Sequence, residues 1–242
     1  MKWDRTKGKP EPVHLLDRVP VHENDEPLVD MRVVCPSVRI VRPTTIPYLR
    51  KSVAEMLEEA SRRLPEGYHL GATDCWRPFS RQVLIYEFIM KCAQEAYPHR
   101  DYRALKRTVN RWVAPIDRPS PPGHCTGAAV DVQLLDPNGE EHDVVSPFNR
   151  FVAAPTYTLG LSETAQRNRD LLVETMLSVG FSNCRDEWWH YSYGDAGWAV
   201  RLDKPSCVYG LVELEPDLYR EQEALAAEAI RSRPNPFITG RG

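Results

Sequence analysis

The sequence predicts an α+β fold, in which a small antiparallel sheet is flanked by helices. Segments with apolar residues at helical spacing and short alternating strands follow one another without forming regular strand–helix–strand units. Hydrophobic residues make up 42 % of the chain and charged residues 27 %, which is typical of a globular protein and too apolar for a disordered one. We therefore expect one folded domain with additions at both ends.

The N-terminal part of the chain combines an irregular segment with one clear helix. Residues 1–45 are rich in proline and mixed in charge, and we expect them to wrap around the domain with a strand or two, for which 32–34 and 38–41 are the β-like runs. A helix is predicted from Pro47, because proline suits the first helical position. The turn residues at 65–67 end it.

A second strand and helix follow. The strand is expected over 68–74, and Ser80 is positioned to cap a helix that runs to about Ala96. The next stretch, 97–122, is basic at first and then rich in proline. We assign no regular element to it.

The clearest strand of the sequence lies over 129–134, where apolar side chains alternate. The Asp136-Pro137-Asn138-Gly139 turn that follows indicates a hairpin. Ser162 is expected to open a third helix, with Gly180 just past its end. The last expected elements are a strand over 188–193 and a charged helix over 216–233, with fraying from Pro234.

Charge and cysteine content exclude several classes of protein. The 31 Lys and Arg residues nearly balance the 34 Asp and Glu residues, so there is no electrostatic footprint for nucleic acid or an anionic membrane. No apolar run has the length of a membrane span, and no secretion signal is expected, which points to the cytoplasm. The six cysteines are widely spaced and form no CxxC pair, so we expect six independent thiols.

Two of the seven histidines have a chemically informative context. His124 precedes the bend that leads into the strand over 129–134, and alternation in that strand points Asp131 away from the apolar face. His190 lies in the last strand, with Glu187 at its entrance. Imidazole and carboxylate groups are zinc ligands, and a nearby glutamate can take a proton from zinc-bound water. On spacing alone, a metal site and a purely structural role of these residues stay equally open.

Three motifs resemble those of a known family. His124, Gly127, Ala129 and Asp131 are similar to the SxHxxGxAxD motif of the zinc D-Ala-D-Ala peptidases. The segment Glu187-Trp188-Trp189-His190-Tyr191 resembles the ExxH motif of their dipeptidase (VanX-type) branch, and Thr73-Asp74-Cys75-Trp76-Arg77-Pro78 resembles Asp-Gly-Tyr-Arg-Pro of that branch. The resemblance implies a hedgehog/DD-peptidase-like zinc fold. It covers about 48–193, which leaves the wrap 1–45 and a C-terminal helical extension over 211–242.

The resemblance also implies roles for single residues. His124, Asp131 and His190 would bind one Zn²⁺ per chain, Glu187 would be the general base, and Arg77 would stabilise the oxyanion. The alternative for Arg77 is a structural salt bridge with Asp74. Cys125 is adjacent to a ligand but is expected to point away from the metal.

The sequence departs from that family where the substrate is expected to bind. Two serines before the motif histidine are replaced by Pro122 and Gly123, and Trp76 replaces a tyrosine. The family's aspartate that meets the substrate ammonium group is matched by Asn149, which keeps a hydrogen-bond acceptor but loses the charge. The hydrolytic centre is thus predicted to be complete, with Trp76, Asn149 and Gly123 in an altered substrate pocket.

Three functions are consistent with these residues. The leading prediction is hydrolysis of D-Ala-D-Ala or another short D-amino-acid peptide. The first alternative is a zinc amidohydrolase that acts on a different modified peptide or specialised metabolite. The second is a non-catalytic, zinc-stabilised binding module, against which the presence of Glu187 argues. The expected partner is a small peptide substrate, and the oligomeric state is not predicted.

Overall fold

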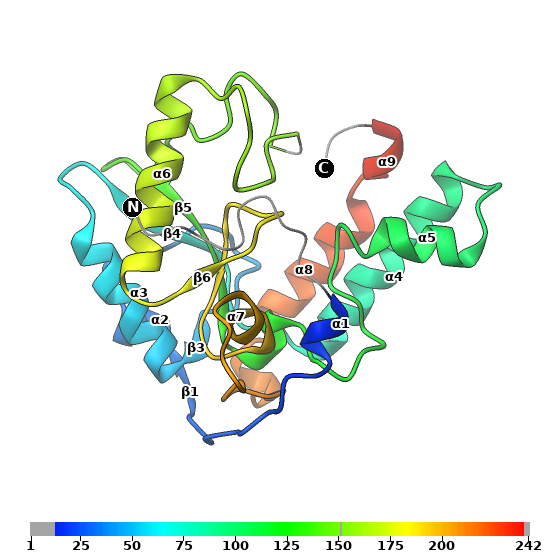
Figure 1. The fold of residues 1–242 in the computed structure, drawn as a ribbon, viewed down its shortest axis with the longest axis horizontal. Coiled ribbons are helices and arrows are strands. Elements are labelled where there is room, and N and C mark those ends of the chain that lie inside the picture. The colour runs from blue at the N-terminus through cyan, green and yellow to red at the C-terminus, as the bar shows by residue number, and fades with distance from the viewer. Residues whose placement is uncertain (1–12, 151, 240–242) are drawn as a thin grey trace.

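A five-stranded mixed sheet with helices on both sides forms the centre of the molecule (Figure 1). The computed structural model describes residues 13–150 and 152–239, so the first part of the predicted N-terminal wrap lies outside the described residues. The strand order is β2-β4-β5-β7-β6. These strands are Arg39–Ile40, His69–Asp74, Ala129–Leu135, His190–Ser192 and Ser182–Asn183.

The predicted α+β class is confirmed, with one addition to the sheet. Strands β4, β5, β7 and β6 pair antiparallel, whereas β2 pairs parallel with β4 at one edge. A second sheet consists of β1 (Leu28–Asp30) and β3 (Tyr48–Arg50), which pair antiparallel. The parallel pair arises because the chain crosses over through β3 and α3 between β2 and β4.

The main core lies between the sheet and helices α3 (Lys51–Arg63) and α6 (Glu163–Ser178). The alternation predicted for β5 is correct: Val130, Val132 and Leu134 are fully buried in this core. Ser162 caps α6 as predicted, since its side chain accepts a hydrogen bond from the Ala165 backbone N–H. At the other end of α6, Gly180 has a φ of +109°, a conformation that glycine adopts without strain.

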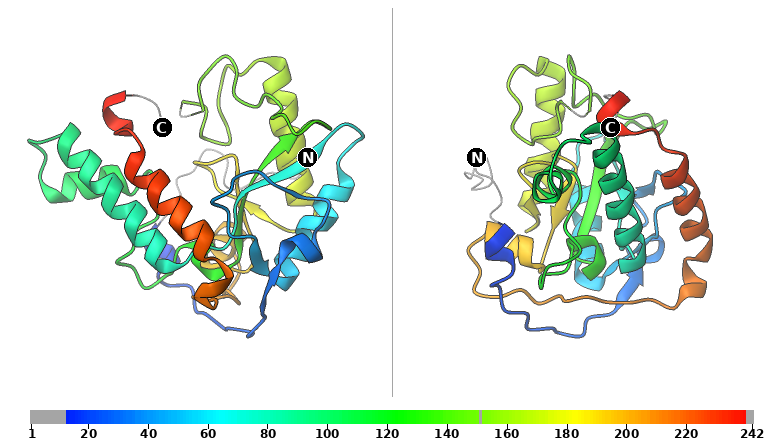
Figure 2. Two further views of the ribbon diagram at one scale, coloured as in Figure 1. Left: turned by 180° about the vertical axis from the view of Figure 1, so that it is seen from behind. Right: turned by 90° about the vertical axis from the view of Figure 1, so that its right-hand side faces the viewer.

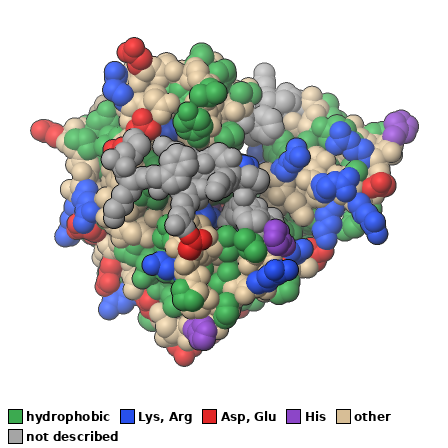
Figure 3. All heavy atoms as spheres, viewed as in Figure 1, with side chains coloured by type: hydrophobic (Ala, Val, Ile, Leu, Met, Phe, Trp, Pro, Cys, Tyr) green, Lys and Arg blue, Asp and Glu red, His purple; other side chains and the backbone are tan. Residues whose placement is uncertain are grey.

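Helices α4 and α8 pack together on the other side of the molecule (Figure 2). Helix α4 spans Phe79–Ala96 and α8 spans Arg220–Ser232. The short helices α5 (Tyr102–Val109) and α9 (Pro236–Thr239) pack on α4 and share a second apolar cluster with it. Figure 3 shows Lys and Arg side chains gathered on this side, where Arg103 and Arg107 of α5 are exposed.

Several predicted elements were wrong in type or extent. Residues 32–34 belong to helix α2 (Met31–Val34), because Asp30 caps its N-terminus and Met31 is buried. Strand β3 follows Pro47, so α3 begins at Lys51. The N-cap of α4 is Pro78, not Ser80. Helix α5 was not predicted, and helix α9 replaces the expected fraying after Pro234.

The remaining short elements connect the layers. They are α1 (Val13–Leu16), the 3-10 helix η1 (Gly123–Thr126), α7 (Ala196–Arg201) and the 3-10 helix η2 (Pro216–Leu218). All six cysteines lie among the described residues and are free thiols, as predicted. Within the part of the chain that the structure describes, no helix is both long and apolar enough to span a bilayer. The domain boundaries stay a prediction.

Candidate metal centre

Pairing of the central strands brings two of the predicted ligands together. Asp131 of β5 lies directly opposite His190 of β7 in the antiparallel register, and Asp74 of β4 lies opposite Asp131 on the other side. Residues opposite one another in a sheet share a face, so these side chains converge. The alternation read from the sequence had already placed Asp131 on the face away from the core.

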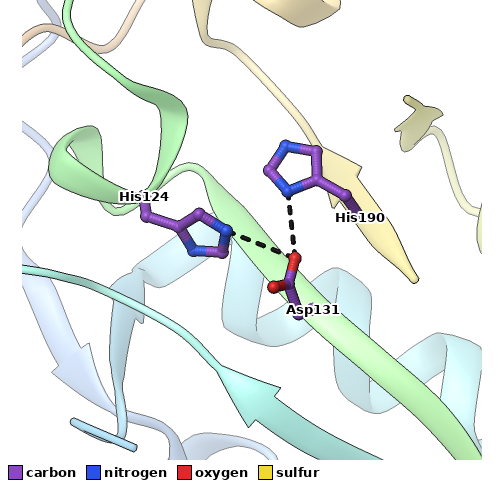
Figure 4. A group of neighbouring side chains, drawn as sticks. All are labelled: His124, Asp131 and His190. Carbon is purple, nitrogen blue, oxygen red and sulfur yellow. Dashed lines mark hydrogen bonds and ion pairs between the residues drawn. The ribbon is translucent and has the colours of Figure 1, made fainter. Parts of the chain in front are cut away.

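The third ligand comes from the turn before β5. His124 lies in η1, and Gly127 reverses the chain with a φ of +70°, while its backbone N–H donates to the His124 carbonyl oxygen. This positive φ is the reason why the turn requires glycine. The bend folds the His124 ring back toward Asp131 (Figure 4).

These three side chains form a compact donor cluster. His124 Nε2 lies 3.2 Å from Asp131 Oδ1, and His190 Nδ1 lies 3.0 Å from the same oxygen. One donor atom from each residue falls within 4.8 Å of the others, and the two imidazole rings meet edge to face at 4.9 Å between centroids. Two imidazole nitrogens and one carboxylate oxygen are the donor set of a catalytic zinc site, which keeps a further position open. The residues present therefore fit a zinc ion.

The protonation of His124 also suits a metal ligand. Its Nδ1 lies 2.8 Å from the Cys75 carbonyl oxygen, which can only accept a hydrogen bond. The proton of the neutral ring is therefore on Nδ1, and the lone pair of Nε2 faces Asp131. A backbone carbonyl that fixes the ring in this way is a regular feature of histidine ligands in metal sites.

Charge within the cluster follows from burial and from the two histidines. Burial raises the pKa of Asp131, but His124 and His190 outweigh this effect and hold that pKa well below its usual range. Burial lowers the pKa of His124, but the negative charge of Asp131 raises it by more. The net effect is a raised pKa. The carboxylate thus stays ionised, as a metal ligand must.

Glu187 is placed beside this cluster by a tight turn. Its carbonyl oxygen accepts a hydrogen bond from the His190 backbone N–H at 3.1 Å. Burial raises the pKa of the Glu187 carboxyl, and the charges of His190 and Asp131 act on it in opposite directions. A raised pKa favours a carboxyl that accepts a proton and later returns it.

Arg77 follows the end of β4, and its backbone N–H donates to the His124 carbonyl oxygen at 3.1 Å. It forms an ion pair with Asp74, and its Nη1 donates to Gln82 Oε1 at 2.6 Å. The structural salt bridge considered for Arg77 is therefore present. Burial lowers the pKa of Arg77, but the charge and hydrogen bond of Asp74 raise it by more. The guanidinium is therefore permanently charged. Its charge also acts on Glu187 and His124.

The predicted substrate-binding residues have neighbours in the structure that account for them in other ways. Trp76 is fully buried against Ile46 and Tyr219, and its Nε1 donates to the Val212 carbonyl oxygen at 3.0 Å. Packing therefore accounts for Trp76, and its ring is not accessible to a substrate. Asn149 is exposed and its side-chain oxygen accepts a hydrogen bond from the Val152 backbone N–H at 2.9 Å.

The side chain of Asp195 lies so close to Gly123 that it explains why this position has no side chain. A Cβ at this position would lie 2.5 Å from Asp195 Oδ2. Asp195 is buried, and its Oδ1 accepts hydrogen bonds from Ser192 Oγ and from the Trp198 backbone N–H, both at 2.7 Å. The side chain of Asp195 thus occupies the space that a serine at 123 would need.

Sequence reasoning missed the residues that support the cluster. Gln82 belongs to no motif, and the Cys75 carbonyl is a backbone group to which no motif assigns a role. Only the fold shows that they hold Arg77 and His124. Arg169 of α6 likewise belongs to none of the predicted site residues. It is 1 % exposed and donates to several carbonyl oxygens between residues 144 and 156, which fastens that loop to α6.

The fold and the cluster together define a class of protein. A mixed sheet that presents His, Asp and His from a turn and two neighbouring strands, with a half-buried glutamate in the next turn, is the arrangement of a metallopeptidase.

Comparison with known proteins identifies the family. Residues 42–209 match the model of the M15 peptidase family, described as D-ala-D-ala dipeptidase, and the chain belongs to this family. A D-alanyl-D-alanine dipeptidase of Synechocystis sp. (strain PCC 6803) is 29 % identical over 183 residues, which are 65 % of this chain and 74 % of that protein. A D-alanyl-D-alanine dipeptidase of Escherichia coli K12 is 27 % identical over 143 residues, 58 % of this chain and 64 % of that protein.

Proposed function

We propose that this peptidase is a zinc-dependent dipeptidase that hydrolyses D-Ala-D-Ala or a closely related short D-amino-acid peptide. The observation that carries the proposal is the set of three donor atoms within 4.8 Å, contributed by His124, Asp131 and His190. The names of the two relatives support the substrate class. One zinc ion per chain fits this donor set.

The roles of the surrounding residues follow from their chemistry. When bound, zinc would supply Lewis acidity, which acidifies water and polarises a carbonyl oxygen. Glu187 accepts the proton of the attacking water and passes it to the leaving amine, for which its raised pKa is suited. Arg77 faces the same space with a permanent positive charge and stabilises the oxyanion of the tetrahedral intermediate. Asp74 and Gln82 hold its guanidinium in place.

The first test of this proposal is Glu187→Gln. We expect the zinc-loaded protein to hydrolyse D-Ala-D-Ala and to leave L-Ala-L-Ala largely intact, with release of D-Ala measured by chromatography. The variant should keep its zinc but lose about a hundredfold or more in kcat, because it cannot accept the proton. Zinc content by elemental analysis is the control. Turnover that does not depend on Glu187 would refute the proposed mechanism.

A different substrate is the second candidate, and the pocket residues favour it. Trp76 is buried, the space beside Gly123 is filled by Asp195, and Asn149 carries no charge. If D-Ala-D-Ala is a poor substrate but a modified peptide is cleaved in a Glu187-dependent way, the chain is a zinc amidohydrolase with another specificity. If zinc binds and no amide is cleaved, it is a zinc-stabilised binding module. Action in the cytoplasm stays a prediction.

A further inference from the structure

A second guanidinium, that of Arg150, lies beside the turn that carries Glu187 and His190. The Arg150 guanidinium carbon is 5.1 Å from the ring centroid of Trp188 and also 5.1 Å from that of Trp189. These two tryptophans are the residues between Glu187 and His190 in the chain. Contact with both rings therefore places the guanidinium against the segment that connects Glu187 to His190.

The loop that carries Arg150 is held on both sides of it. Arg169 of α6 donates to the Val144 carbonyl oxygen at 2.6 Å and to the Ala153 carbonyl oxygen at 2.8 Å. The next carbonyl, that of Ala154, accepts a hydrogen bond from the Trp188 backbone N–H at 3.0 Å. The loop is thus tied to α6 and to the segment that carries Glu187, which fixes where Arg150 can reach.

The charge of Arg150 is accessible to a ligand. Its side chain is 33 % exposed, and its ion pair with Glu141 is long, at 3.4 Å, with Glu141 itself 42 % exposed. An exposed pair of this kind contributes little and exchanges readily for another anion. Arg77 differs, because its Nη1 and Nη2 groups bond to Gln82 and Asp74 and are held in place by them.

The charges around Arg150 are consistent with this position. The pKa of Arg150 is lowered, mainly by burial and also by the charge of Arg42. The charges of Glu141 and Asp131 act in the opposite direction. Asp131, a proposed metal ligand, is thus one of the charges that act on the guanidinium. Arg42 adds a second positive charge to the same region, so an incoming anion would be favoured there.

We propose that Arg150 is a specificity-determining residue, which binds a carboxylate of the substrate while the scissile bond lies over the His124, Asp131 and His190 cluster. A guanidinium matches a carboxylate with two parallel N–H donors, and the tryptophan faces hold its plane. The carboxylate has two possible sources: the C-terminal carboxylate of the leaving residue, or an acidic group on the acyl side. This inference rests on the proposed peptidase function.

The test uses two pairs of peptides that differ in one charge. D-Ala-D-Ala is compared with its C-terminal amide, and N-succinyl-D-Ala-D-Ala amide is compared with N-acetyl-D-Ala-D-Ala amide. For one pair we expect the carboxylate form to have a kcat/KM about tenfold higher or more, as for a charge-assisted hydrogen bond. Arg150→Gln should abolish that preference and Arg150→Lys should keep part of it. The affected pair identifies the source of the carboxylate.

Two further variants separate local from general charge effects. Arg167→Gln removes the same charge from the exposed surface of α6, where Arg167 contacts Thr164, and should leave the preference unchanged. Glu141→Gln removes the anion that competes for Arg150 and should increase the preference. Circular dichroism and the melting temperature confirm that each variant is folded.

Binding measurements distinguish failure of this inference from failure of the proposed function. Calorimetry on zinc-loaded Glu187→Gln, with and without Arg150→Gln, gives dissociation constants for all four peptides without any need for turnover. A carboxylate preference in binding that Arg150→Gln removes supports the inference even if no peptide is cleaved. Equal affinity for both members of each pair, a preference that survives Arg150→Gln, or no binding at all overturns it.

Discussion

Asp131 is the residue on which the candidate site depends, because both histidines meet the same carboxylate oxygen. One ring nitrogen of each histidine lies close to that oxygen, His124 Nε2 at 3.2 Å and His190 Nδ1 at 3.0 Å. A metal ion would replace these contacts with bonds to the same atoms. The cluster is thus prearranged for binding, and little side-chain rotation is needed to receive the ion.

Gly123 provides a prediction at the level of one side chain. Gly123→Ser should destabilise the metal-free protein by about 1–3 kcal/mol, because the added Cβ overlaps the buried Asp195 carboxylate and well-packed surroundings must shift. Urea denaturation measures the loss. The double variant Gly123→Ser, Asp195→Ala should lose less than the sum of the two single changes, because the overlap is gone. Additive losses would contradict the proposed steric conflict.

Single residues also show how far the site could be predicted from sequence. The partners Asp131 and His190 follow from strand alternation and from motif spacing, since both are local patterns. Trp76 could not be placed in this way. Its ring is buried by Tyr219 and its Nε1 bonds to the Val212 carbonyl oxygen, and both partners lie in a segment more than a hundred residues away in the chain. Such contacts leave no local pattern in the sequence.

Among the elements, helix α6 links the core to the loop of Arg150. Its N-cap is Ser162, whose hydroxyl accepts the Ala165 backbone N–H at 3.1 Å. We expect Ser162→Ala to lower the free energy of unfolding by about 1 kcal/mol, the usual cost of losing such a cap. Ser162→Asp should restore most of the loss, because aspartate also caps and its charge favours a helix N-terminus. Thermal and urea unfolding measure both.

If Ser162→Asp were less stable than Ser162→Ala, the Ser162 hydroxyl would not be the group that caps the helix. The exposed Ser232 at the end of α8 supplies a matched control, since its hydroxyl bonds only to carbonyl oxygens of its own helix. Ser232→Ala should change the free energy of unfolding by less than about 0.5 kcal/mol, as surface substitutions usually do.

The elements that sequence reasoning missed are short, and tertiary contacts decide their type. Residues 32–34 were predicted as a strand because a run of three residues is too short to show whether its apolar side chains repeat as in a helix or as in a strand. The Asp30 cap and the buried Met31 settle them as a helix. Helix α9 likewise forms where Phe237 packs edge to face against Tyr97 and Trp112. The long elements, such as β5 and α6, were predictable because their own patterns suffice.

At the scale of the whole molecule, the C-terminal segment connects the two sides of the fold. The Val212 backbone N–H donates to the Cys125 carbonyl oxygen, next to the proposed ligand His124, at 3.2 Å. Farther along, Glu223 of α8 forms an ion pair with the buried Arg81 of α4. The C-terminal extension thus covers Trp76 and α4, and contributes to the surroundings of the site.

The whole molecule should also be stabilised by the ion that the site is proposed to hold. A ligand that binds only the folded state adds RT ln(1 + [L]/Kd) to the free energy of unfolding, or about 1.4 kcal/mol per tenfold rise in free ligand once the site is saturated. Zinc should follow this relation in urea denaturation at chelator-buffered zinc concentrations. Free thiols of the unfolded chain also bind zinc, so the observed slope will be somewhat smaller.

Asp131→Asn isolates the contribution of the site. It retains all six cysteines, so zinc binding to the unfolded chain is unchanged, while the carboxylate shared by His124 and His190 is lost. Its stability should therefore be independent of free zinc or fall as zinc rises. The difference in slope between the original protein and this variant then measures binding to the folded site alone. Equal slopes would mean that zinc stabilises the protein elsewhere, and the His124, Asp131 and His190 assignment would be wrong.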